Sequence, residues 1–148
     1  MKIVSIYKLK DRLLIHPDSR TTAGVWIAAE PFLPLPLNSS SSDVGSAVSV
    51  ALEGSLDRAP HPTDWRATAA PRLSAAGVRS ERSFQMGTAL VTVTQSEDGY
   101  IVEPHLNGGA SGDNKGFHPI PELQRSISHD SNHAAIGSAV IDSLEACR

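Results

Sequence analysis

The side chains of this sequence best suited to acid–base or metal chemistry are its six histidines. His129 and His133 lie four residues apart, a spacing that places two imidazoles on one face of a helix for zinc. No glutamate lies between them in the manner of an HExxH motif, and no third ligand is indicated. The segment resembles a loop leading into a helix, so we expect no metal site.

Two histidines could also act together in general acid–base catalysis. His105 and His118 are the candidates, and they leave a small histidine-dependent hydrolase or ribonuclease as the alternative function. The sequence does not fix the distance between them. His118, like His16 and His61, adjoins a proline at the boundary of a predicted element, where a turn or capping contact is the expected role.

Neither a nucleophile nor a cofactor loop is indicated. A GxSxG elbow is absent, and Cys147, the only cysteine, is expected at the last core-facing position of a helix. The segment NGGASGDNKG (107–116) lacks the GxxxxGKS or GxxxxGKT order of a phosphate-binding loop, and no helix follows it directly. We expect a flexible loop there, no cofactor, no catalytic residues and hence no enzyme.

Length and composition predict one folded domain spanning residues 1–148. Of the 148 residues, 40% are hydrophobic and 20% are charged, far from the composition of a disordered chain. The net charge of −3 argues against direct binding of nucleic acid or of an anionic membrane. The start MKIVSIYKLKDRLL lacks the apolar core of a secretory signal, and a single cysteine suits a reducing compartment, so we expect a cytoplasmic protein.

The elements that must position these residues begin with a predicted hairpin. The β-rich run 2–9 and a returning strand that stops at Pro17 flank a tight turn. The polar segment DSRTTAG (18–24) is expected to be a loop, and VWIAAE (25–30) a third strand. Two prolines in the following FLPLP exclude a regular helix or a central strand there.

A second hairpin is predicted in the C-terminal half of the chain. The alternating run TALVTVTQ (88–95) and the return strand YIVEP (100–104) flank the turn SEDG (96–99). Pro104 is expected to end the return strand as Pro17 ends its counterpart.

Three helices are predicted. An apolar stripe at helical spacing begins near Ser42 or Asp43 and ends close to Gly54, and a last helix spans about 131–147. Between them, HPTDW begins a helical insertion over about 61–77. Pro71 either kinks this helix or opens a new one, and the sequence does not decide between the two.

The two ends of the chain repeat each other in order. The phrases LLIHP, FLPLP and VGSAVSVALE of the first half correspond to YIVEP, FHPIP and IGSAVIDSLE of the second. We expect a single α+β domain whose antiparallel sheet is built from two similar hairpin–strand–helix halves, about 2–55 and 88–148. Gly45 and Gly137 disfavour a helix by ~1 kcal/mol each relative to alanine, so they predict a close backbone approach.

Five short segments in order, TTAGVWIAAEP, APHPTDW, AAGVRS, IVEP and GFHPIPE, resemble the CdiI immunity proteins of bacterial contact-dependent growth inhibition systems. The resemblance implies a small cytoplasmic antitoxin without catalysis. Such a protein binds the C-terminal toxin domain of a large secreted adhesin delivered by a neighbouring cell, and blocks its active site. The resemblance also implies a monomer, or a 1:1 heterodimer with the toxin. The glycine-rich segment 107–116 and ELQRSISHDSNH (122–133) depart from the pattern and are candidate contact loops.

The toxins of such systems are often nucleases with basic clefts, so the resemblance implies that an acidic surface faces the partner. The candidate contacts are Glu97 and Asp98 at the tip of the second hairpin, Asp113 in the glycine-rich loop, and Asp18 and Arg20 in the segment after the first hairpin. Buried aromatic or arginine side chains would supply most of the affinity.

Overall fold

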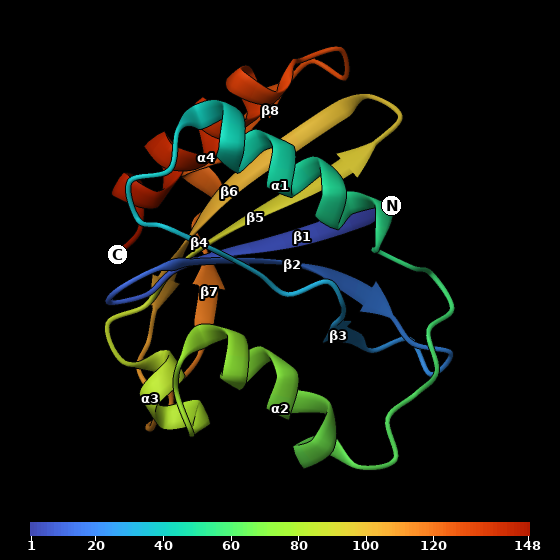
Figure 1. Cartoon of the computed structure of the whole chain (residues 1–148), viewed down its shortest axis with the longest axis vertical. Coiled ribbons are helices and arrows are strands. Elements are labelled where there is room, and N and C mark those ends of the chain that lie inside the picture. Colours follow the sequence, from blue (N-terminus) through green and yellow to red (C-terminus); the bar gives the residue numbers. More distant parts are fainter.

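An eight-stranded antiparallel sheet forms the middle layer of the molecule (Figure 1). The computed structural model describes residues 1–148. The strands are β1 (Lys2–Lys8), β2 (Leu13–Arg20), β3 (Trp26–Ala28), β4 (Leu33–Leu35), β5 (Ala89–Ser96), β6 (Gly99–Asn107), β7 (Phe117–Pro119) and β8 (Arg125–Ile127). The helices are α1 (Ser41–Glu53), α2 (Trp65–Ala76), α3 (Glu81–Gln85) and α4 (His133–Ala146), with one turn of 3-10 helix at Pro121–Leu123.

Two hairpins meet at the centre of the sheet. Its strand order is β3-β2-β1-β5-β6-β7, while β4 pairs with β2 and β8 with β6. The hairpins β1–β2 and β5–β6 join through β1 and β5, with Val4 opposite Val93 and Ile6 opposite Val91. The predicted single-domain α+β fold with an antiparallel sheet is confirmed.

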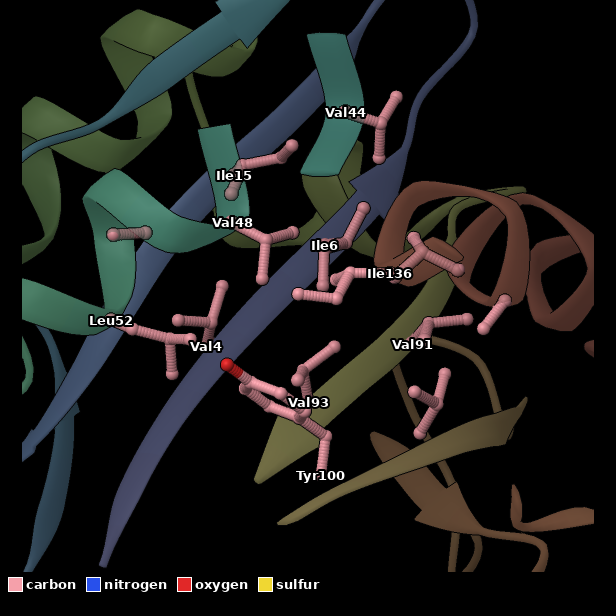
Figure 2. Close-up of a cluster of buried hydrophobic side chains, with 14 of the residues drawn as sticks. Val4, Ile6, Ile15, Val44, Val48, Leu52, Val91, Val93, Tyr100 and Ile136 are labelled. Carbon is pink, nitrogen blue, oxygen red and sulfur yellow. The ribbon is translucent and has the colours of Figure 1, made fainter. Parts of the chain in front are cut away.

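The main core lies between the sheet and the helices α1 and α4. The alternation of β1 and β5 sends Val4, Ile6, Val91 and Val93 toward these helices, and all four are fully buried (Figure 2). The apolar faces of α1 and α4 pack against these strand residues through the buried residues Val44, Val48, Ile136 and Val140. Each such side chain contributes ~1.5–3 kcal/mol through burial, so this layer holds most of the hydrophobic stabilisation.

A smaller core lies on the opposite face of the sheet, under α2 and α3 (Figure 1). Its buried residues are Leu9, Leu14, Ala76 and Phe84. The sequence analysis did not predict α3, which begins where the Ser80 hydroxyl accepts from the Ser83 amide. None of the helices is long and apolar enough to cross a membrane.

Pro17 and Pro104 do not end their strands, which corrects the prediction. β2 continues to Arg20 and β6 to Asn107. Pro17 lies between the stretches of β2 that pair with β4 and β3, and Pro104 lies between the stretches of β6 that pair with β8 and β7. Both proline carbonyls point into these gaps, where they accept from Ala29 and Ile120. In an antiparallel strand the N and O of one residue face the same neighbouring strand. The position where each proline lacks an N–H therefore also faces the gap, and no hydrogen bond of the sheet is lost.

The two halves of the chain follow the same pairing scheme. Residues 13–15 of β2 pair with β4 and 18–20 with β3, while residues 100–102 of β6 pair with β8 and 105–107 with β7. The match of FLPLP with FHPIP was therefore wrong, because FLPLP contains β4 whereas FHPIP contains β7, the counterpart of β3. A duplication as the origin of the two halves remains a proposal.

The middle helix is continuous through Pro71, which resolves the alternative that the sequence left open. The Asp64 carboxylate caps it by accepting from the Arg66 and Ala67 amides, each at 3.1 Å, and Gly77 ends it in the left-handed conformation. Ala76 is the only residue of α2 that is fully buried, so most of this helix lies at the surface.

Candidate functional site

Asp18 lies in β2 rather than in an exposed loop, which corrects the prediction. Its side chain is 20% exposed, and one carboxylate oxygen accepts a hydrogen bond of 2.6 Å from the Ser5 hydroxyl. Burial raises the pKa of Asp18 to about 6. Held by Ser5 and mostly buried, this carboxylate presents little surface to a partner.

His16 is fully buried in the middle of β2, not at the end of an element as expected. Its Nδ1 lies 2.9 Å from the Pro17 carbonyl oxygen and 3.7 Å from the Asp18 carboxylate. Burial lowers the pKa of His16 to about 4, so the ring is neutral near pH 7 and forms no ion pair with Asp18. Nδ1–H donates to the carbonyl, and Nε2 has no partner.

Aromatic rings surround this polar pair. Tyr7 contacts His16 at a centroid distance of 5.5 Å, Phe84 at 4.7 Å and Phe117 at 5.8 Å. Burial raises the pKa of Tyr7 above its usual range. Perturbed pKa values often mark functional sites, but Ser5, Tyr7, His16 and Asp18 line none of the surface hollows described below. The cluster is therefore part of the folded interior.

The two histidines considered for acid–base catalysis both contact backbone carbonyls. His105 Nδ1 lies 3.2 Å from the Glu103 carbonyl oxygen, and burial lowers the pKa of this ring. His118 Nε2 lies 3.0 and 3.1 Å from the carbonyl oxygens of Asn114 and Lys115. His118 thus holds the glycine-rich loop, the contact expected for a histidine beside a turn.

His129 and His133 do not form a metal site with other ligands. His129 lies in the loop before α4, and His133 is the first residue of that helix. No group of three or more His, Cys, Asp or Glu side chains lies close enough to hold a metal ion. The thiol of Cys147 donates to the Leu90 carbonyl at 3.2 Å, and the residue packs against the main core as predicted.

The acidic candidates lie at opposite ends of the sheet. Glu97 and Asp98 are exposed at the β5–β6 turn, and Asp113 is exposed in the loop that follows the other end of β6. At ~3.3 Å per residue, the length of β6 separates them by roughly 25–30 Å. Arg20 is exposed and lies at the same end of the sheet as Glu97 and Asp98. These residues cannot form one compact patch.

Arg20 borders a small polar hollow of about 470 Å³. Thr21, Thr22, Gly24, Asp57 and Arg58 also line it. Both arginines are exposed, and one carboxylate lies among them. Another hollow, of about 770 Å³, lies near the C-terminus and is bordered by Met86, Asn107 and Cys147.

A larger groove of about 810 Å³ lies between β3 and α2. Its chemistry comes from the side chains of Trp26, Trp65, Arg66, Arg72, Arg79 and Glu81, and we call it the Trp/Arg groove. The sequence analysis did not single out these residues. The available signal was that Trp65 stands among polar residues, in HPTDWR, whereas Trp26 in the apolar VWIAAE gives none.

Arg72 forms the fixed part of the Trp/Arg groove. Its guanidinium lies 4.3 Å from the centroid of the Phe84 ring and forms an ion pair with Glu81. The Arg72 side chain is only 14% exposed. A stacked and paired guanidinium keeps its donors in one orientation, which favours recognition of a planar carboxylate.

Two solved structures share this fold over almost the whole chain. A protein of unknown function from Neisseria meningitidis matches with a TM-score of 0.79 and 16% identity, covering 99% of this chain and 95% of that one. A chain of the CdiA-CT/CdiI toxin and immunity complex from Yersinia pseudotuberculosis matches with a TM-score of 0.76 and 14% identity, covering 99% and 97%. No family model and no curated protein matches the sequence.

Proposed function

We propose that this protein is an immunity protein that binds and neutralises the C-terminal toxin domain of a contact-dependent growth inhibition system. The observation that carries the proposal is the match of fold, over 99% of the chain, to a chain of a toxin and immunity complex. The five segments that resemble CdiI proteins support it independently. Neutralisation by binding requires no catalysis, which agrees with the structural contacts made by the histidines.

In the proposed mechanism the protein meets the toxin in the cytoplasm of the recipient cell and occludes its active site in a 1:1 complex. The proposed toxin is a nuclease with a basic cleft. The exposed Glu97 and Asp98, at a two-residue turn, could reach into such a cleft. Complementary charge would speed association, and buried contacts would slow dissociation.

The test begins with the gene directly upstream, which should encode a very large secreted adhesin. Its C-terminal fragment is co-expressed with this protein. We expect co-purification, a 1:1 mass by light scattering, and growth of cells that the fragment alone would arrest. The matched control is a fragment of similar size from an unrelated toxin, which should neither bind nor be neutralised.

Absence of both binding and rescue with the adjacent fragment would reject the proposal. Binding without rescue would separate the two parts of it, because the protein would then recognise the domain without blocking its activity.

A further inference from the structure

The N-terminal half of α2 contributes no residue to either core, and its aromatic contact is that of Trp65 with the His61 ring, at a centroid distance of 5.5 Å. The smaller core takes Leu73, Ala75 and Ala76 from the C-terminal half of this helix. Trp65 and Arg66, in the first turn, are exposed, and Trp65 is 53% exposed although its side chain is among the largest apolar groups of the protein. Figure 1 shows this end of α2 away from the sheet. A helix end that displays tryptophan and arginine without burying them is typical of an interface.

The Trp/Arg groove collects the residue types that dominate binding energies. It holds both tryptophans of the chain and three arginines, against the single carboxylate of Glu81. Glu81 is paired with Arg72, whereas neither Arg66 nor Arg79 forms an ion pair. The groove therefore carries a positive charge, although the whole chain carries a net charge of −3.

The acid nearest to Arg66 along the helix does not neutralise this charge. The Asp64 carboxylate accepts from the backbone amides of Arg66 and Ala67 at 3.1 Å, as the cap of α2. The Arg66 guanidinium is consequently free to pair with a carboxylate from outside the chain.

We infer that the Trp/Arg groove binds an acidic segment of the toxin domain. Arg66 and Arg79 pair with its carboxylates, Arg72 provides a fixed donor at the floor, and Trp65 and Trp26 pack against an apolar side chain of the same segment. The inference rests on the proposed function and names the chemistry of the partner at one surface. That surface is distinct from Glu97 and Asp98, which would meet basic residues.

The size of the groove favours a protein segment over a nucleic acid. A hollow of about 810 Å³ accommodates a few side chains. A nucleic acid backbone requires a track of cations along many phosphates, which the net negative charge of this chain does not supply.

The test uses the toxin domain and this protein labelled with fluorotryptophan. Its fluorine NMR spectrum contains two resonances, from Trp26 and Trp65, and both report on the groove. Unlabelled toxin domain should shift both. The double variant Arg66→Glu/Arg79→Glu should weaken binding by about 10- to 100-fold and reduce its dependence on salt.

The control variant Lys8→Glu/Lys10→Glu makes the same change of charge outside the groove and should bind within about threefold of the wild type. All four substituted residues are exposed, and circular dichroism would verify that both variants fold. Tight binding that leaves both resonances unmoved, or equal binding by the groove variant, would overturn the inference while the proposed function stands. Failure of the wild type to bind any toxin fragment would overturn both. The same shifts on adding single-stranded RNA would show that the groove is not built for an acidic protein segment.

Discussion

Gly45 of α1 and Gly137 of α4 lie against the backbone of each other's helix. A β-carbon on Gly45 would lie 1.8 Å from the carbonyl oxygen of His133, and one on Gly137 would lie 1.7 Å from that of Ser41. The contact is reciprocal, because His133 and Ser41 each precede a glycine by four residues. A methyl group at either position would force the partner backbone to move. The two glycines therefore set the distance at which the helices cross above the sheet.

Substitution of either glycine should destabilise the fold. Gly45→Ala and Gly137→Ala should each lower the free energy of unfolding by about 1–3 kcal/mol, because the strain of overpacking exceeds the ~1 kcal/mol gain in helix propensity. Urea unfolding followed by circular dichroism measures the change. Ser138→Ala, at an exposed neighbouring position of α4, is the control and should remain within about 0.5 kcal/mol of the wild type. A Gly45→Ala variant as stable as the wild type would contradict this role.

The local patterns of the sequence predicted the central elements, since hydrophobic periodicity and turn residues act over short distances. The stripe from Val44 to Leu52 and the turn at Glu97–Asp98 are where the patterns placed them. The strand ends predicted at the prolines were wrong. Whether Pro17 ends a strand depends on the strands that pair with β2, and the gap between β3 and β4 is a feature of the tertiary structure. Likewise, nothing near Asp18 indicates that β2 continues past it.

The candidate site was less predictable than the fold. The Trp/Arg groove joins Trp26 of β3 to Arg66 of α2 and to Arg79 beyond it, and no sequence motif links these positions. The sequence shows which residues carry a negative charge, but it does not show which of them are exposed. Whether Asp18 and Asp98 face solvent depends on strand pairing, which buries the first and exposes the second.

Asp18 and His16 should give opposite slopes to the dependence of stability on pH. Burial raises the pKa of Asp18 from 3.8 to about 6, so the stability from its protonated form is complete below about pH 3.8 and is lost as the pH rises through 6. Burial lowers the pKa of His16 from 6.5 to about 4, so the stability from its neutral form is complete above about pH 6.5 and is lost as the pH falls through 4. The two contributions oppose each other in the wild type between about pH 4 and 6.

Asp18→Asn should remove one of these slopes. Asparagine cannot ionise, and its amide oxygen can still accept from the Ser5 hydroxyl. The variant should exceed the wild type in free energy of unfolding by about 1–3 kcal/mol near pH 7, and the difference should vanish toward pH 4. Urea unfolding at a series of pH values tests this. Asp113→Asn, in an exposed loop, is the matched control, expected to change stability by less than about 0.5 kcal/mol. A constant difference across the pH range would refute the assignment.

His16→Gln should remove the opposite slope. Glutamine can still donate to the Pro17 carbonyl, and the test depends on the slope with pH rather than on absolute stability. Between about pH 6 and 4 the variant should gain stability relative to the wild type as the pH falls, because only the Asp18 contribution remains. Parallel curves for the variant and the wild type would show that His16 does not titrate as burial implies.

His118→Ala should loosen the glycine-rich loop without removing any activity. The His118 ring contacts the Asn114 and Lys115 carbonyls, so amide hydrogen exchange within 109–116 should accelerate while the sheet remains protected. Purified wild-type protein should not cleave RNA. Cleavage by the wild type that disappears in His118→Ala would instead establish the histidine-dependent ribonuclease.

Charge reversal should show which acidic residues steer the toxin. Glu97→Lys/Asp98→Lys changes two adjacent exposed residues and should slow association with a basic toxin about tenfold or more at low salt, with little effect on dissociation. Asp113→Lys, at the other end of β6, should have a smaller effect if the partner approaches the β5–β6 turn. Stopped-flow or surface-binding kinetics at two salt concentrations measure both.

The control for these reversals must change the net charge equally. Asp11→Lys/Glu145→Lys alters two exposed residues at the end of the sheet remote from the β5–β6 turn. Because steering depends on where the charge lies, this variant should associate nearly as fast as the wild type, whereas an effect of net charge alone would slow both double variants equally. An unchanged association rate for Glu97→Lys/Asp98→Lys at low salt would remove the turn from the interface and leave the Trp/Arg groove as the surface to map.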